Sequence, residues 1–390
     1  MKPPRSLAGV RFRTTVVCAL AAGVPALGLL GAGPAAASGG RGSAGAVFAQ
    51  LNSPSGNEIA AYSRGADGRL AAVDRYPTGG LGGTEVNAPF DALASQSSLT
   101  FTEDRHTLLA VNAGSDTVTS FHVHGATLRR ASVVASGGRF PSSITTRGDL
   151  VYVLNAGGSG SISGFRLHDD QLFPLTNSTR SLGNANANPP LFINAPAQIG
   201  LTSDGRFLLL TTKAHNQLLT FAIGKDGRPA ATPTATASTG AVPFSFVIDP
   251  RGRVHVTEAG TGRTSSYTVT PTGALRALGT SASDGGAALC WNVRIGKTIY
   301  GANAGSATLS AWRIQDSGQA LLTAPVATTT NAGPIDLAAS DDGDFLYVQE
   351  SVAGTLGAYQ VSEVGALTRL QTVTGLPAYA AGGMEGIAAS

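Results

Sequence analysis

The sequence predicts an all-β fold in which seven repeated units close into a ring. The first observation is a repeated hairpin pattern, which consists of an apolar strand, a small polar turn and a second strand that ends on an aromatic residue. It occurs at 108–121, 150–165, 298–312 and 345–359. Secondly, aromatic residues end such strands every 44 to 59 residues, at Tyr62, Phe121, Phe165, Phe221, Tyr267, Trp312 and Tyr359. Units of this length, each with about four short strands, are typical of the blades of a β-propeller.

The N-terminal 37 residues are predicted to be an export signal rather than part of the fold. Lys2, Arg5, Arg11 and Arg13 precede an apolar stretch at 14–30, and small residues lead up to Ala37. This order of charge, apolar core and small residues is typical of a secretory signal peptide. We therefore expect cleavage after Ala37, secretion, a flexible leader at 38–45 and a propeller at 46–390.

The charge of the chain argues against nucleic acid as a partner. The whole chain carries +3, whereas residues 1–37 contain four cations and no acid, so the remainder carries −1. A protein that binds a phosphate backbone needs a clustered basic face, and the sequence shows none. After cleavage we expect a monomer with no membrane attachment. Its single cysteine, Cys290, leaves no intrachain disulfide.

The remaining chain divides into units in order. The first begins with a strand at 46–50, a turn at 52–56 and a strand at 58–62. The next six are expected to begin with central strands near 98, 141, 196, 243, 288 and 334. No helical periodicity is visible outside the signal.

The two ends of the chain are predicted to share one blade. The C-terminal segment 383–390 (GMEGIAAS) repeats the start of the seventh unit, 333–340 (GPIDLAAS), and then the chain stops. The first unit lacks such a central strand, so each fragment supplies what the other lacks. Closure of this kind removes the exposed strand edges that invite aggregation.

One face of the ring is expected to carry the functional site. Two long connections, 76–94 and 173–194, enter central strands on that face, and long loops on a rigid scaffold are where binding groups concentrate. Two sets of polar positions converge there. The turns after the second strands carry Asn303, Glu258 and Glu350, and the starts of the central strands carry Gln198, Ser245, Cys290 and Asp336.

At this point the repeat resembles the seven-bladed lactonase family, which includes 6-phosphogluconolactonase-like and carboxymuconate-cyclase-like proteins, and the related YVTN-type surface propellers. The residues that carry the resemblance are Val111-Asn112-Ala113-Gly114-Ser115, Ala302-Asn303-Ala304-Gly305-Ser306 and Ser203-Asp204-Gly205-Arg206. The resemblance implies hydrolysis of a small sugar-derived or carboxylated lactone. In the family, a histidine and an Arg-His pair enter two central strands. Gln198 and Phe244-Ser245 stand at those positions here.

The residues themselves suggest a site in which Lys213 and His215 lie beside Glu258. Lactone opening needs a base that activates water and a donor for the developing oxyanion. Glu258 or His215 would be the base, and Lys213 the electrostatic donor. The expected substrate-binding residues are Asn194, Gln198, Phe244, Ser245, Asn303, Asp336 and Glu350.

Two functions stay open on this reading. The first is a secreted lactonase that needs no cofactor. The second is a non-catalytic extracellular module that binds a glycan, peptide or protein on the same face. Asp336 and Glu385 could bind a cation in the channel, but the sequence lacks the dense acidic spacing of a calcium loop. No metal site is therefore predicted.

Overall fold

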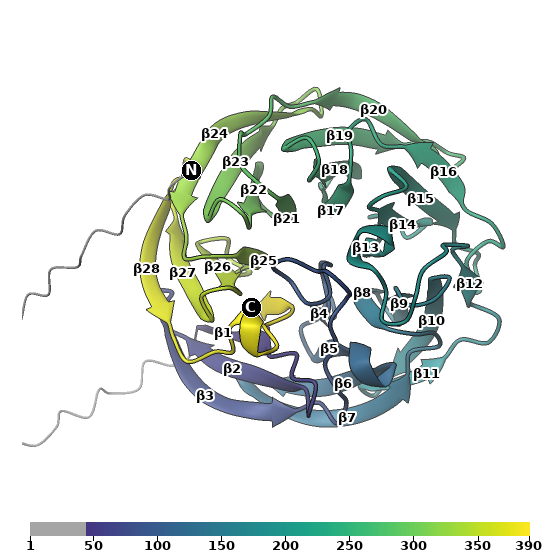
Figure 1. Ribbon diagram of the computed structural model, residues 1–390, viewed down its shortest axis with the longest axis horizontal. Coiled ribbons are helices and arrows are strands. Elements are labelled where there is room, and N and C mark those ends of the chain that lie inside the picture. The colour runs from purple at the N-terminus through teal and green to yellow at the C-terminus, as the bar shows by residue number, and fades with distance from the viewer. Residues whose placement is uncertain (1–43) are drawn as a thin grey trace, which may run out of the picture. The chain divides into compact units, whose positions relative to one another are not determined.

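The computed structural model describes residues 44–390, and the predicted signal peptide lies outside this part of the chain. Seven β-sheets are arranged around a common centre, with one strand of each sheet innermost (Figure 1). Within residues 44–390 the only helices are three short 3₁₀ turns, η1 (Ala113–Ser115), η2 (Phe192–Asn194) and η3 (Tyr379–Ala381). The predicted all-β propeller of seven blades is confirmed.

Each blade is an antiparallel sheet whose strands follow one another outward from the centre. The second, third and fourth blades contain β4 (Leu99–Phe101), β5 (Thr107–Asn112), β6 (Thr117–His124) and β7 (Thr127–Ala135); β8 (Pro141–Arg147), β9 (Leu150–Asn155), β10 (Ser161–His168), β11 (Gln171–Pro174) and β12 (Arg180–Ser181); and β13 (Pro196–Leu201), β14 (Phe207–Thr212), β15 (Gln217–Ala222) and β16 (Thr234–Ala237).

The fifth to seventh blades repeat this order without interruption. They contain β17 (Pro243–Ile248), β18 (Arg253–Glu258), β19 (Arg263–Val269) and β20 (Leu275–Thr280); β21 (Leu289–Ile295), β22 (Thr298–Asn303), β23 (Thr308–Ile314) and β24 (Ala320–Thr329); and β25 (Pro334–Ala339), β26 (Phe345–Glu350), β27 (Thr355–Val361) and β28 (Leu367–Val373).

The first blade is assembled from both ends of the described chain, as predicted. It contains β1 (Gly45–Gln50), β2 (Glu58–Arg64), β3 (Leu70–Pro77) and, innermost, β29 (Ile387–Ala389). β29 pairs antiparallel with β1, with Phe48 opposite Ala388. The Arg64 guanidinium donates a hydrogen bond of 3.1 Å to the Ser390 carbonyl oxygen, which fastens the last residue to β2.

Neighbouring blades are joined by tyrosines on their second strands. The Tyr300 hydroxyl donates to the Gly365 carbonyl of the next blade over 2.8 Å, and the Tyr347 hydroxyl donates to the Gly68 carbonyl over 2.9 Å. The second of these bonds crosses from the seventh blade to the first. The seam between the chain ends is therefore fastened in the same way as the interior joints.

A β-bulge interrupts the innermost strand near its start in five blades. The register shifts by one residue after Pro141, Pro196, Pro243, Leu289 and Pro334. A bulge bends its strand and re-aims side chains, and bulges are common beside functional sites. The extra residues at these positions all lie on the face that carries the long loops.

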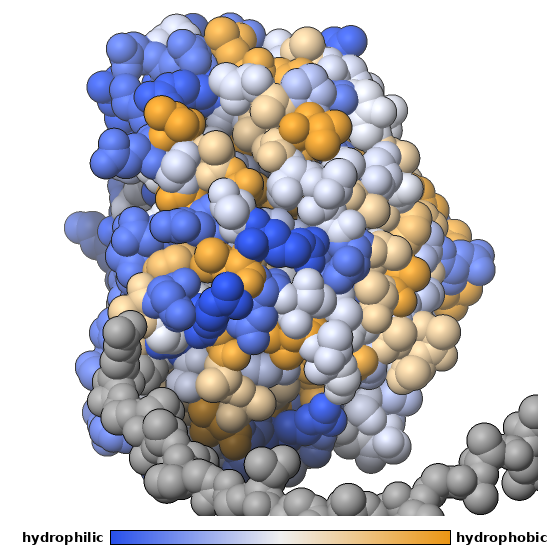
Figure 2. All heavy atoms as spheres, turned by 90° about the vertical axis from the view of Figure 1, so that its left-hand side faces the viewer, coloured by the Kyte–Doolittle hydropathy of each residue, from blue (hydrophilic) through white to orange (hydrophobic). Residues whose placement is uncertain are grey.

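The outer rim is a mixed surface. On the side that Figure 2 shows, apolar groups are small and separated by polar ones. The exposed large apolar residues include Val326 of β24 and Val364 of the loop before β28. Within residues 44–390, no helix is long and apolar enough to span a membrane.

Candidate functional site

The two long connections meet over the centre of the ring. Val86, from the connection between the first and second blades, pairs with Leu191, from the connection between the third and fourth. The Val86 amide donates to the Pro190 carbonyl over 2.8 Å, and the Phe192 amide donates to the Val86 carbonyl over 3.1 Å. The Tyr379 hydroxyl of η3 donates to the Ala88 carbonyl from the far side. Three loops distant in sequence thus form one ordered cover.

A pocket of about 320 Å³ opens at this cover. Its walls are mostly apolar and come from the two long connections, from the bulges of β17 and β21 and from the turn after β18. The residues that line it are Pro89, Phe90, Asp91, Ala94, Phe192, Ile193, Lys213, Val242, Phe244, Ala259, Gly260, Ala288, Cys290 and Trp291.

Two aromatic rings form one wall of the pocket. Phe244 and Trp291 meet edge to face, with ring centroids 5.0 Å apart. Both residues lie within bulges: Phe244 with Ser245 in β17, and Trp291 with Cys290 in β21. The bulges therefore turn large side chains toward the pocket at positions where a regular central strand would carry small ones.

Lys213 lies under the pocket and is completely buried. Its Nζ lies 3.4 Å from Glu85 Oε2 and donates a 2.8 Å hydrogen bond to the Ala94 carbonyl. The same nitrogen lies 5.8 Å from the ring centre of Phe192 and 5.5 Å from that of Phe244. Burial raises the pKa of the Glu85 carboxyl well above its usual range, although the positive charge of Lys213 acts in the opposite direction.

Asp91 is the only acidic residue that lines the pocket. Its carboxylate accepts hydrogen bonds from the Trp291 indole nitrogen at 3.1 Å, from the Leu93 amide at 2.9 Å and from the Ser95 amide at 3.2 Å. The Trp291 nitrogen also donates to the Ser95 carbonyl at 2.7 Å. Asp91 is therefore held rigidly at the pocket floor.

Two further buried carboxyl groups lie beneath Asp91. The Leu93 amide donates to Glu385 Oε2 over 3.0 Å as well as to Asp91, so one backbone group lies between the two carboxyl groups. Asp336 accepts from the Gly386 amide at 3.0 Å. Burial, followed by the Asp91 charge, raises the pKa of Asp336 and of Glu385 well above the usual range. Burial also raises the pKa of Asp91, but its hydrogen bonds oppose that effect.

The two neighbouring carboxyl groups have different surroundings. Asp91 accepts three hydrogen bonds, from Trp291, Leu93 and Ser95, whereas Glu385 accepts one, from Leu93. Gly386, directly after Glu385, has a φ of +76°, and a Cβ there would lie 2.3 Å from Ser98 Oγ, so glycine lets this segment approach the second blade closely. Within residues 44–390, no group of three or more His, Cys, Asp or Glu side chains is arranged to hold a metal ion.

Several of the predicted site residues lie at the pocket. Lys213 and Phe244 line it, and Asp336 belongs to the buried carboxyl cluster. Asn194 ends η2 directly after the lining residue Ile193. His215 lies exposed in the turn two residues after Lys213, and no hydrogen bond or ion pair connects it to Lys213 or Glu258.

Glu258 is completely buried but is not among the lining residues. Its Oε1 accepts hydrogen bonds from Ser238 Oγ at 3.0 Å and the Gly240 amide at 2.8 Å, and Thr239 Oγ1 lies at 3.1 Å. The carboxylate thus fixes the loop that leads into β17. The hydrogen bonds of the Glu258 carboxylate are therefore made with this loop.

Glu350 and Asn303 occupy the same place in their blades. Glu350 accepts from the Asn331 amide at 2.9 Å and from Arg369 at 2.7 Å. The Asn303 side chain donates to Ser310 Oγ at 2.8 Å. Asn303 thus bonds to β23, the next strand outward, and Glu350 bonds to β28, the outermost strand of its blade. These turn residues hold the loops together on the functional face.

Gln198 and Ser245, where the resemblance led us to expect histidines, are engaged between strands. The Gln198 amide pairs with the backbone of Phe246, donating over 3.1 Å and accepting over 2.6 Å. The Ser245 hydroxyl donates to the Cys290 carbonyl at 2.5 Å. Both side chains join adjacent innermost strands.

The residues that sequence reasoning missed are mostly in the long connection. Glu85 and Asp91 lie there, Trp291 lies in a bulge, and Glu385 was noted only as a possible cation ligand. One signal was available, because Glu85 and Asp91 are the only acids in the connection 76–94.

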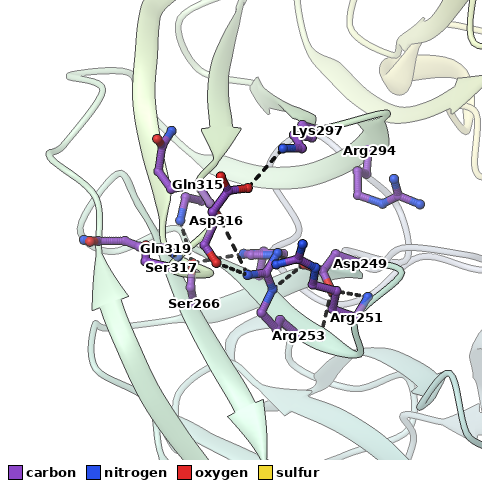
Figure 3. Close-up of polar contacts among 12 residues, drawn as sticks. Asp249, Arg251, Arg253, Ser266, Arg294, Lys297, Gln315, Asp316, Ser317 and Gln319 are labelled. Carbon is purple, nitrogen blue, oxygen red and sulfur yellow. Dashed lines mark hydrogen bonds and ion pairs between the residues drawn. The ribbon is translucent and has the colours of Figure 1, made fainter.

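A second polar cluster lies on the opposite face, at the turn between β17 and β18. Figure 3 shows Arg253 between Asp249 and the turn that carries Gln315 and Asp316, with Lys297 bonded to Asp316. Buried His255 lies 3.5 Å from Asp249 and 3.0 Å from Ser266 Oγ. The order Asp249, His255, Ser266 resembles a catalytic triad. However, Ser266 is fully buried, and its hydroxyl accepts a hydrogen bond from the Ala320 amide, so the cluster joins the fifth and sixth blades.

Comparison with known proteins agrees with the predicted resemblance. The family model described as Lactonase, 7-bladed beta-propeller matches residues 159–290, from the third blade to the start of the sixth. This segment includes Lys213, Phe244 and Cys290 of the pocket. A comparison with curated proteins found no match.

Solved structures share the fold at low sequence identity. A protein from Lactobacillus plantarum is 16% identical, with a TM-score of 0.69 over 89% of this chain and 99% of its own. A Bacteroides uniformis protein, provisionally described as a 6-phosphogluconolactonase, is 16% identical (TM-score 0.66, 85% and 97%). The periplasmic gluconolactonase of Pseudomonas aeruginosa is 18% identical (TM-score 0.59, 85% and 98%). At such identities the likeness shows the fold alone.

Proposed function

We propose that this lactonase-type propeller hydrolyses a lactone in the pocket at its loop-bearing face, with Asp91 as the general base. The observation that carries the proposal is that Asp91 lines the pocket and shares the Leu93 amide with a second buried carboxyl group, Glu385. Environments that push the proton affinities of two carboxyl groups apart are typical of acid–base sites.

The reaction follows from these positions. Ionised Asp91 accepts a proton from a water molecule while the water oxygen bonds to the lactone carbonyl carbon. The buried charge of Lys213 acts on the negative oxygen that forms, because electrostatic interactions are strong where water is excluded. The ring C–O bond then breaks, and the departing oxygen takes the proton back from Asp91. The product is a hydroxy acid, and Glu385 keeps its own proton.

The raised pKa of Asp91 favours this role. A carboxylate whose pKa lies closer to the working pH is a stronger base than an ordinary aspartate. Its three hydrogen-bond donors hold one orientation, which is the preorganisation that catalysis requires. No cofactor takes part in the proposed steps.

Proton release from a panel of lactones tests the proposal. Asp91→Asn should lower kcat by a factor of about 100 or more, the usual contribution of a general base. Glu258→Gln is the matched comparison, because sequence analysis predicted Glu258 or His215 as the base. On the present proposal Glu258→Gln retains kcat in the fraction that folds. Loss of kcat in Glu258→Gln with full activity in Asp91→Asn would assign the base to Glu258 instead.

A non-catalytic binding module is the second candidate. It is favoured by the engagement of Gln198 and Ser245 between strands, since the histidines of lactone-cleaving relatives would stand there. Saturable ligand binding in the pocket without any turnover would support this candidate over hydrolysis.

We also propose that the protein is exported and acts as a monomer on a small molecule. The support is the charge and apolar pattern of residues 1–37 and the absence of a basic cluster in the remaining sequence. Mass measurement of secreted protein should give an N-terminus at Ser38. An N-terminus at Met1 on protein retained in the cytosol would contradict export.

A further inference from the structure

We infer that the ligand of the pocket is an uncharged lactone with an apolar alkyl or aryl substituent, rather than a phosphorylated or polyhydroxylated sugar lactone. That the ligand is a lactone rests on the proposed function. The inference adds the chemical class of its substituent, which follows from the walls of the pocket.

The walls offer apolar surface and few free polar groups. The large lining residues are Phe90, Phe192, Ile193, Val242, Phe244 and Trp291. The polar tip of Trp291 is already bonded to Asp91 and to the Ser95 carbonyl. A sugar hydroxyl placed against such walls would lose its bonds to water without replacement, which is unfavourable.

The charges in the pocket are arranged against an anionic ligand. Lys213 is the only cation among the lining residues. Its ammonium group is already bonded to Glu85 and to the Ala94 carbonyl and is fully buried. Asp91 also lines the pocket, and Glu85 already balances the charge of Lys213. A phosphate or carboxylate would bring a full permanent charge beside the Asp91 carboxylate, whereas the oxyanion of lactone opening carries its charge only during the reaction.

The size of the pocket limits the substituent. A volume of about 320 Å³ is at the small end of the range for ligand pockets. It accommodates a five- or six-membered ring with a short chain or one aromatic ring. Each buried methylene should tighten binding about fourfold, until the pocket is full.

Binding can be measured without turnover. Trp291 forms a wall of the pocket, and the chain has only one other tryptophan, Trp312, which is buried in the sixth blade. We would titrate the protein with γ- and δ-lactams carrying chains of none to six carbons and follow Trp291 emission. Lactams resist hydrolysis, so affinity is read separately from catalysis. Glucono-δ-lactone and its 6-phosphate are the polar comparisons.

The expected result is affinity that rises with chain length, by about fourfold per methylene, and no saturation by either sugar lactone at the same concentrations. Tighter binding of a sugar lactone, or no binding of any alkyl lactam, would overturn the inference. Alkyl lactams that bind while no lactone is hydrolysed would leave the ligand class standing and remove the proposed reaction. Hydrolysis of sugar lactones alone would leave the proposed reaction standing and remove the inferred ligand class.

A variant that fills the pocket provides the second test. Ala259 lines the pocket in the turn after β18, and Ala259→Phe should weaken binding of the longest lactam at least tenfold. Ala353 lies exposed in the turn after β26 and does not line the pocket. Ala353→Phe is the matched control and should bind as the parent does. Equal weakening in both variants would contradict the assignment to this pocket.

Discussion

Lys213 and Glu85 form an ion pair in which neither side chain is exposed to solvent. Lys213 comes from the turn after β14, whereas Glu85 comes from the long connection between the first and second blades. Their contact, with a nitrogen–oxygen distance of 3.4 Å, fastens the cover loop to the fourth blade. The cost of removing the two charges from water offsets much of their attraction. The pair therefore positions the loop more than it stabilises the fold.

The two members of this pair should respond differently to substitution. Lys213→Met removes the ammonium group that bonds to both the Glu85 carboxylate and the Ala94 carbonyl, so it should lower the free energy of unfolding by about 3 kcal/mol. Glu85→Gln keeps an oxygen that can accept from Lys213 and should cost about 1 kcal/mol or less. Urea unfolding at pH 7 measures both. Equal losses would show that the charge on Glu85 is essential to the loop.

Glu385 should make the protein more stable in acid than in base. Its folded-state pKa is raised, so its contribution is fully present below the pKa of the unfolded chain and is lost as the pH rises through the folded-state pKa. Glu385→Gln resembles the protonated form and should avoid this loss.

Over pH 5 to 8, the urea midpoint of Glu385→Gln should therefore exceed that of the parent by an amount that grows until the pH passes the folded-state pKa of Glu385. Glu363, in the exposed turn before β28, provides the control substitution Glu363→Gln, which should leave the pH profile unchanged. A constant difference between Glu385→Gln and the parent across this range would contradict the raised pKa.

His255 should have the opposite effect at low pH. Burial lowers its pKa to about 4, despite the nearby Asp249. Its unfolded value is about 6.5, so the neutral form is favoured in the fold. The contribution of His255 to the free energy of unfolding is present above pH about 6.5. It is lost as the pH falls toward 4, by about 3 kcal/mol in total. In His255→Gln this part of the pH dependence should disappear, and an unchanged acid slope would refute the assignment.

The C-terminal strand should be necessary for stability. Deletion of residues 383–390 removes β29 and leaves the inner edge of β1 without a partner. Buried Met384 and Ile387 are lost as well, which by itself costs about 4 kcal/mol. Ser390→Ala removes only the bond from the Ala46 amide and should cost about 1 kcal/mol. Thermal unfolding distinguishes the two, and a deletion variant that melts with the parent would refute closure by this strand.

The repeat made most of the fold predictable from the sequence. The hairpin expected at 345–359 corresponds to β26 and β27, which begin at Phe345 and Thr355. The first strand begins at Gly45, one residue before the predicted start. These elements are local, and each repeats a pattern that the packing of adjacent blades imposes.

The site was less predictable because its residues depart from the repeat. Phe244, Trp291 and Asp336 lie in bulges, where the two-residue alternation of a strand fails. Glu85 and Asp91 lie in a connection that has no counterpart in most blades, so no periodicity places them. Glu258 was predicted as a base because it is an acid in a turn on the expected functional face, but its Oε1 accepts hydrogen bonds from the loop that leads into β17.

The pH dependence of kcat/KM for lactone hydrolysis tests the proposed base most directly, because it reports the pKa of the essential base in the free enzyme. The parent should lose activity as the pH falls through a value above the usual range of aspartate. Asp91→Asn should have low activity with no such inflection, and Glu258→Gln should keep it. An inflection that persists in Asp91→Asn, or that vanishes in Glu258→Gln, would contradict the account.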